Sequence, residues 1–287
     1  MRNLLFVIAT LISSYAVAQD REFKLNENYS ISSDGVIELS SSDAKVNIKG
    51  TDRTDVLVDI YRKVSVKGLS LGEREFQVEV YEDDGNLIIK ERTRGSVSVS
   101  MVAYRREVYT IDIEAPKGVS LRIEGDDDDY FIENIHGSVS LDIDDGDAEL
   151  MNCSGNDFYF DFDDGNIKMD RGDGRLKVKS DDGDISIRKA TFSEVDVNMD
   201  DGDIEIETSL ADDGSYLFRS SDGGIYFNVT EGGGEFLIYH DDTRVSVSGD
   251  FDIDRDEEDE TRLKLGQGTA NIKMRVDDGR VQIKADN

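Results

Sequence analysis

Apolar and polar residues alternate in pairs of short runs along much of this chain, and the two runs of each pair meet at Asp-Asp-Gly. Four successive copies are the most regular: SVSLDIDDGDAEL, FYFDFDDGNIKM, LKVKSDDGDISI and VDVNMDDGDIEI. Alternation with a period of two is typical of a β-strand with one buried face. Each copy therefore predicts a strand before the turn, the pre-turn strand, and a strand after it, the post-turn strand. Recurrence at a nearly fixed length indicates a solenoid.

The turn glycines Gly146, Gly165, Gly183 and Gly202 give a common reference for the inward positions. Side chains seven, five and three residues before each glycine, and two and four residues after it, are predicted to form the core. These positions hold Val139, Leu141, Ile143, Ala148, Leu150, Phe158, Phe160, Phe162, Ile167, Met169, Leu176, Val178, Ser180, Ile185, Ile187, Val195, Val197, Met199, Ile204 and Ile206.

The repeat extends beyond these four copies. With Asp128 and Thr243 in place of glycine, the reference positions are 128, 146, 165, 183, 202, 223 and 243, at intervals of 18 to 21 residues. This spacing predicts seven consecutive rungs, a rung being a pre-turn strand, its turn, a post-turn strand and a second connection. Ser33-Asp34-Gly35 and Asp83-Asp84-Gly85 are followed by apolar residues at the same two positions, which predicts the same phase for them.

Three segments are expected along the chain. Residues 1–18 have an N-terminal arginine, an apolar run and an Ala-Val-Ala cleavage signal, which together indicate a secretory signal peptide. Residues 19–118 contain strands of unequal length and are expected to form an irregular N-terminal β subdomain that caps the stack. Residues 119–287 form the regular solenoid. An acidic insertion at 251–260 interrupts it, and the pattern then returns, which predicts a last rung or cap at the C-terminus.

The charge of the chain limits its partners. It contains 64 Asp and Glu against 33 Lys and Arg, a net charge of -31. Such a surface repels phosphate backbones and anionic lipids, so we expect neither a nucleic acid nor a membrane surface as partner. Cations and basic proteins are better candidates. Cys153 is the only cysteine, which excludes an internal disulfide.

The paired aspartates are the candidate metal ligands. If the rungs stack at about 4.8 Å, equivalent carboxylates stack as well and repel one another. Two interpretations are open: ordinary turn chemistry, in which glycine takes a positive φ and Asp bonds to the backbone, and a row of calcium sites. The candidate ligands are Asp144, Asp145, Asp163, Asp164, Asp181, Asp182, Asp200 and Asp201.

Two tyrosines are candidate ligand-binding residues, and no catalytic residue is expected. Tyr159 and Tyr226 occupy outward positions of the alternation and could stack on sugar rings or contact a partner. Glycoside hydrolysis needs two carboxylates with different roles at one site, whereas the acids here are equivalent in every rung. The chain also lacks a nucleophile beside a histidine and a nucleotide-binding loop.

The segments VIELSSSDAKVNIKG and YTIDIEAPKGVSLRI and the DGDI-type turns resemble the bacterial putative-adhesin family of β-strand-repeat proteins, whose function is unknown. The resemblance covers most of residues 30–285. It implies an exported parallel β-solenoid in the periplasm or at the cell surface, with no catalytic residues to carry over. The usual turn of that family is Ser-Gly-Asp, so the Asp-Asp-Gly turns are a departure from it.

The expected fold is therefore all-β: a parallel β-solenoid (β-helix) with rungs of about 19 residues, two strands per rung and an irregular β cap at the N-terminus. The expected function is a secreted, non-enzymatic binding or structural module in the periplasm, at the cell surface or outside the cell. Its partner would be a protein or glycan of the envelope, without membrane insertion after signal cleavage. No cofactor is expected unless Ca²⁺ occupies the aspartate row. The alternatives are a calcium-binding acidic scaffold and a polysaccharide-active enzyme.

Overall fold

The computed structural model describes residues 18–71, 74–95, 99–241, 243–257 and 259–286, so the predicted signal peptide, except Ala18, lies outside the described residues. Within these ranges 22 strands form one continuous sheet. The first seven are β1 (Ala18–Ser30), β2 (Val36–Ser41), β3 (Lys45–Thr51), β4 (Asp55–Leu71), β5 (Arg74–Asp83), β6 (Asn86–Gly95) and β7 (Val99–Pro116). The middle of the chain forms β8 (Ser120–Gly125), β9 (Asp129–Glu133), β10 (Val139–Asp145), β11 (Ala148–Met151), β12 (Asp157–Asp164), β13 (Ile167–Asp170), β14 (Asp173–Asp182), β15 (Ile185–Asp201), β16 (Ile204–Thr208) and β17 (Ser215–Val229). The last five are β18 (Gly234–His240), β19 (Thr243–Ser248), β20 (Phe251–Asp256), β21 (Glu260–Leu265) and β22 (Ala270–Ala285).

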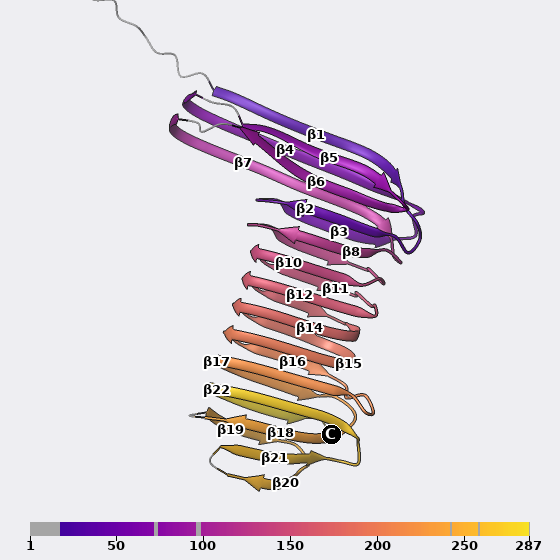
Figure 1. The fold of residues 1–287 in the computed structure, drawn as a ribbon, viewed down its shortest axis with the longest axis vertical. Helices are drawn as coiled ribbons and strands as arrows, with labels where there is room; N and C mark the ends of the chain where they lie inside the picture. Colours follow the sequence, from indigo (N-terminus) through magenta and orange to yellow (C-terminus); the bar gives the residue numbers. More distant parts are fainter. Residues whose placement is uncertain (1–17, 72–73, 96–98, 242, 258, 287) are drawn as a thin grey trace, which may run out of the picture.

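Successive rungs stack by parallel pairing (Figure 1). Val139 of β10 pairs with Phe158 of β12, Phe158 with Leu176 of β14, and Leu176 with Val195 of β15, which are offsets of 19, 18 and 19 residues. The post-turn strands β11, β13, the first part of β15, and β16 pair in the same way. The predicted all-β class with parallel strands between repeats is confirmed. None of the described residues forms a helix that could span a membrane.

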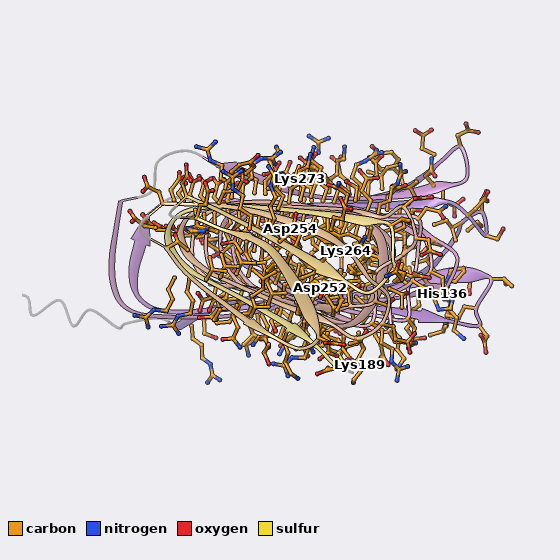
Figure 2. All side chains as sticks on the ribbon, turned by 90° about the horizontal axis from the view of Figure 1, so that it is seen from below. His136, Lys189, Asp252, Asp254, Lys264 and Lys273 are labelled. Atoms are coloured by element: carbon orange, nitrogen blue, oxygen red, sulfur yellow. The ribbon has the colours of Figure 1, made fainter. Side chains whose placement is uncertain are left out.

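The core lies between the column of pre-turn strands and the column of post-turn strands. Every inward residue predicted from the four regular copies is at most 4% exposed. The outward positions carry polar and charged side chains, and Figure 2, which looks along the stack from its C-terminal end, shows them projecting from the outer faces. The inward face predicted from alternation is therefore confirmed. Cys153 is buried and unpaired beside this core.

The strands after the two N-terminal Asp-Gly sequences, residues 33–35 and 83–85, keep the predicted inward positions, because Ile37, Leu39, Leu87 and Ile89 are buried. Leu87 pairs with Ile37, and Ile37 pairs in turn with Leu121 of β8, so the strands that follow these glycines belong to the pre-turn column. The repeat pattern does not distinguish the two columns, because alternation with a period of two is the same on both sides of a turn. Asp84 and Gly85 have φ values of 46° and 81° and join β5 to β6 as a two-residue hairpin turn.

Strand β22 lies at a different level of the stack from the one that sequence order predicts. Gly279 pairs with Gly223 of β17 on one side and with Thr243 of β19 on the other. The rung of Thr243 therefore does not follow the rung of Gly223, and the prediction of seven consecutive rungs is wrong at this step. The acidic insertion forms the antiparallel hairpin β20–β21 beyond β18, and the chain then returns to fill the place between β17 and β18 (Figure 1).

Antiparallel strands also occupy the N-terminal end of the stack. Strand β1 pairs with β4 and β4 with β7, while β5 and β6 form a hairpin. Edge-to-face aromatic contacts join the β1–β4–β7 strands to the β5–β6 hairpin, because Phe76 of β5 contacts both Phe23 of β1 and Tyr109 of β7. Strand β2 pairs directly with β8, so strands on both sides of residue 118 belong to one stack. The division into domains at that residue stays a prediction.

The turn glycines form a column of close backbone contacts. A Cβ atom added to Gly183, whose φ is 121°, would lie 1.9 Å from the carbonyl oxygen of Gly165. A Cβ atom added to Gly165 would lie equally close to the carbonyl oxygen of Gly146. Glycine is thus required both for its positive φ and because the next rung leaves no room for a side chain.

We predict that Gly183→Ala lowers the free energy of unfolding by about 3 kcal/mol, because it combines an unfavourable φ with a backbone clash. The matched control is Gly266→Ala, where φ is also positive (57°) but no atom lies within 4 Å of the added Cβ atom. The control should cost about 1 kcal/mol. Urea unfolding followed by circular dichroism measures both. Equal losses would show that φ alone, and not contact between rungs, accounts for the glycines.

Candidate functional site

The aspartates directly before the turn glycines form one continuous row. Asp145 pairs with Asp164, Asp164 with Asp182, and Asp182 with Asp201. The row continues through Asp222 and then to β22. All eight predicted metal ligands are exposed on this edge of the stack. Among the described residues, however, no three His, Cys, Asp or Glu side chains are grouped closely enough to hold a metal ion. Calcium binding at the row stays a prediction.

The carboxylates of this row disfavour one another's charge. The pKa of Asp182 is raised above its ordinary value by loss of hydration and then by the charges of Asp164 and Asp201. The pKa of Asp145 is raised by loss of hydration and then by Asp164 and Asp127. The row therefore stores repulsion that low pH or bound cations would relieve.

The residue directly after each turn glycine has a structural role that the sequence analysis missed. The Asp147 carboxylate accepts a hydrogen bond from the backbone N–H of Asn166 at 2.9 Å, and Asn166 Oδ1 accepts one from the N–H of Asp184 at 3.1 Å. Asp184 and Asp203 each accept the corresponding N–H of the next rung. This side-chain ladder satisfies a backbone donor at each turn. Its signal was visible in the sequence, because Asp or Asn follows the glycine in all four regular copies.

Asp128 takes the place of glycine in the first regular turn and is fully buried. Its carboxylate accepts hydrogen bonds from the N–H of Ala44 at 2.5 Å and from the hydroxyls of Ser41 and Tyr130, both at 2.9 Å. Burial raises the pKa of Asp128 to about 6, although these three hydrogen bonds oppose the shift. Asp128 thus joins β2 and β3 to the first turn of the regular stack.

The structure places the two predicted ligand-binding tyrosines on opposite faces. Tyr159 lies on the pre-turn strand β12, where its hydroxyl donates to Asp161 at 2.6 Å. The ammonium groups of Lys177 and Lys179 lie 5.9 Å from the centre of its ring. Tyr226 lies on the post-turn part of β17. The two residues cannot contact one ligand together, and Tyr159 is already engaged by its neighbours.

Tyr226 lies where two surface depressions adjoin. One, of about 530 Å³, is lined by Asp203, Gly223, Gly224, Tyr226, Arg244, Gly279 and Arg280. The other, of about 750 Å³, extends along the post-turn face and is lined by Asn166, Lys168, Asp184, Ile185, Ser186, Asp203, Glu205, Ile206, Glu207, Tyr226, Phe227, Asn228, Gln282 and Lys284. Both depressions share Asp203 and Tyr226, and together we name them the Tyr226 groove. Hydrogen-bonding side chains around one half-buried aromatic ring form a surface that suits a polar ligand.

Parallel strands hold the floor of this groove. Glu205, Tyr226 and Gln282 are register partners on β16, β17 and β22, so they project side by side from three successive levels. Their inward neighbours Ile206 and Phe227 are buried in the core. The side chains of the Tyr226 groove are therefore carried by a rigid scaffold rather than by loops.

The stacked parallel rungs with their turn ladders define a β-strand-repeat protein of the solenoid class. The family model described as Toastrack DUF4097 matches residues 36–284, and the chain belongs to this family. The resemblance to a putative-adhesin family of unknown function is thereby confirmed. None of the curated proteins compared with the chain matches it.

Several solved structures are similar over nearly the whole chain. A putative adhesin from Parabacteroides distasonis is 9% identical, with 94% of this chain and 98% of that chain covered and a TM-score of 0.43. A putative cell adhesion protein from Clostridium sporogenes is 12% identical, covering 93% and 100%, with a TM-score of 0.27. A protein from Parabacteroides distasonis described as a putative lipid binding protein is 13% identical, covering 94% and 97%, with a TM-score of 0.31. Likenesses at this level carry no information about the ligand of this chain.

We predict that Asp182→Asn raises the melting temperature at neutral pH, because it removes a charge from the middle of the aspartate row. The gain should be largest at about 10 mM salt and small at about 1 M, where the Debye length falls to about 3 Å. The folded-state pKa of Asp182 is raised, so its ionisation destabilises the fold, and the gain should vanish as pH falls and the wild-type carboxyl becomes protonated.

The control for this measurement is Asp212→Asn, which removes one exposed charge outside the row. An equal gain in both variants would contradict repulsion within the row. The same melting assay tests the calcium hypothesis: if millimolar calcium leaves the melting temperature of chelator-treated protein unchanged, specific binding at the row is wrong.

We predict that Asp128→Asn flattens the pH dependence of stability between about pH 4 and 6. Because the folded-state pKa is raised to about 6, the stabilisation by the protonated carboxyl is complete below the ordinary pKa and is lost as pH rises through 6. The asparagine keeps an acceptor for the N–H of Ala44 and stays neutral, so it should be up to about 3 kcal/mol more stable than wild type at pH 7. Denaturant titrations at several pH values measure this, with the exposed Asp129→Asn as control. Parallel pH profiles for wild type and Asp128→Asn would refute it.

Proposed function

We propose that this protein is an exported, non-enzymatic, adhesin-like binding module of the cell envelope, and that its Tyr226 groove binds a glycan. The observation that carries the proposal is the position of Tyr226, whose ring lies where two adjoining polar depressions meet. An aromatic ring offers an apolar surface to a sugar, while the surrounding amide, hydroxyl and charged groups can bond to its hydroxyls. The partially buried position of Tyr226 holds the ring in place.

The extended form of the groove supports a polymeric or oligomeric ligand. Its longer depression runs from Asn166 to Lys284 across the levels of β13, β15, β16, β17 and β22. Neighbouring strands in a sheet lie about 4.8 Å apart, so these five levels present a surface roughly 20 Å long. A chain of sugars fits such a surface better than a small metabolite does.

A binding function, rather than catalysis, is supported by the character of the acids. Glu205 accepts hydrogen bonds from Ser186 at 3.2 Å and from Arg188 at 3.4 Å, so its carboxylate is already engaged. Asp184 and Asp203 hold the backbone N–H groups of the next rung. Side chains that hold the scaffold in this way are poor candidates for a proton donor or a nucleophile.

Export and the capped solenoid belong to the same proposal. Residues 1–18 have the composition of a signal peptide, and we place the mature protein in the periplasm, at the cell surface or outside the cell. Rungs of about 19 residues are supported by the observed pairing offsets. The antiparallel strands β1, β4, β5 and β6 would act as a cap, because they cover the first parallel rungs and reduce open edge pairing.

We predict that wild-type protein binds members of a glycan array without altering them, and that Tyr226→Ala lowers the affinity about tenfold or more, since a buried aromatic contact contributes that much to recognition. The control is Tyr159→Ala, which removes the same side chain from the opposite face and should bind like wild type. Affinity by biolayer interferometry and product analysis by mass spectrometry provide the readouts. Equal effects of the two variants would contradict the site, and cleavage of a bound glycan would favour the enzyme alternative.

A further inference from the structure

Two arginines lie side by side at one end of the Tyr226 groove. Arg280 of β22 and Arg244 of β19 are register partners on adjacent parallel strands, and both are exposed. Among the described residues, neither guanidinium forms an ion pair with a carboxylate. Like charges opposite each other on neighbouring strands destabilise a sheet.

Like charges also meet elsewhere in the stack, in the aspartate row and at the register partners Arg219 and Arg275, but Arg219 lies 3.0 Å from Asp196 and Arg275 lies 3.5 Å from Asp277. Several further cross-rung contacts combine opposite charges. On the pre-turn face, Asp157 pairs with Arg175 at 2.6 Å and Asp196 with Arg219 at 3.0 Å. On the post-turn face, Asp170 pairs with Lys189 at 3.0 Å. Arg244 and Arg280 differ from these arginines because neither has a carboxylate partner among the described residues, and in a chain with a net charge of -31 such a pair suits a negatively charged ligand.

Gly224 connects this arginine pair to Tyr226. It is the register partner of Arg280, and a Cβ atom added there would lie 2.5 Å from Cε2 of Tyr226 and 2.6 Å from Oδ1 of Asp203. The tyrosine ring therefore lies across the glycine that pairs with Arg280, and Tyr226, Arg244 and Arg280 line the same depression. A sugar ring that contacts Tyr226 would bring its substituents to Arg280 and Arg244.

We propose that Arg244 and Arg280 bind the acidic group of a saccharide whose sugar ring contacts Tyr226. The proposal rests on the glycan-binding function proposed for the Tyr226 groove and specifies the class of ligand. Guanidinium groups bind carboxylate and sulfate oxygens in a bidentate manner, so either acidic group is suitable. The adjacent aspartate row repels a continuous polyanion, which favours a glycan with isolated acidic groups among neutral sugars.

The test uses matched triplets of immobilised glycans: a neutral oligosaccharide, the same oligosaccharide with one carboxylate-bearing sugar, and the same with one sulfate. At about 150 mM salt, wild-type protein should bind at least one acidic form about tenfold or more tightly than the neutral form, which is the effect of a charged hydrogen-bonding pair. The carboxylate and sulfate arms identify which group is recognised. Arg280→Gln and Arg244→Gln should each lower binding of the acidic form far more than binding of the neutral form, and so remove most of this preference.

The control is Arg175→Gln, which removes one positive charge from the opposite face and should keep the preference. Thermal melting gives a second readout: without ligand, Arg280→Gln should melt at a higher temperature than wild type because it relieves repulsion from Arg244. Tyr226-dependent binding without preference for acidic forms would overturn this inference and leave the glycan function standing. Absence of binding to all glycans would overturn both. A lowered melting temperature of Arg280→Gln would assign the pair a structural role instead.

Discussion

The arrangement of this molecule depends on a tight steric contact between the turn backbones of successive rungs. The carbonyl oxygen of each turn glycine lies so close to the turn glycine of the next rung that the latter has no room for a Cβ atom. This contact fixes the distance between rungs at the turn, and the hydrogen bonds of the parallel strands fix it elsewhere. Every equivalent side chain is therefore brought into a row. Rows of apolar side chains form the core, whereas rows of like charge cost stability.

The chain uses its acidic residues in three different ways along one turn. The residue after the glycine accepts a backbone N–H from the next rung, and Asn166 fills that role as well as an aspartate does. The residue before the glycine lies beside its equivalents, and loss of hydration together with the neighbouring carboxylates raises the pKa of Asp145 and Asp182. Asp128 replaces the glycine itself and is buried among three donors. The acidic turns thus provide a ladder of side-chain to backbone hydrogen bonds, a row of repelling carboxylates and one buried carboxylate that joins the N-terminal strands to the stack.

Alternation predicted which side chains enter the core, because burial depends only on which face of a strand a residue occupies. It could not predict which strand lies above which. The apolar residues after Gly35 and Gly85 fitted either column, and pairing with β8 decided between them. The repeat length likewise depends only on the number of residues between turns, so it does not predict that a strand returns from the end of the chain to an inner level. The antiparallel hairpin β20–β21 takes the end of the stack, and β22 fills an inner level.

The arginine pair could not be predicted from the sequence either, because the order of the turns along the chain differs from the order of the rungs in the stack. If the rung of Thr243 followed the rung of Gly223, Arg244 would stand beside Gly224 and would have no charged neighbour in its row. Only the insertion of β22 brings Arg280 next to Arg244 and both next to Tyr226. Tyr226 could be selected from the sequence because its outward position depends on alternation alone. Its surroundings could not, because they depend on the return of the last strand. The Tyr226 groove is thus a product of topology, assembled where the chain departs from its own repeat.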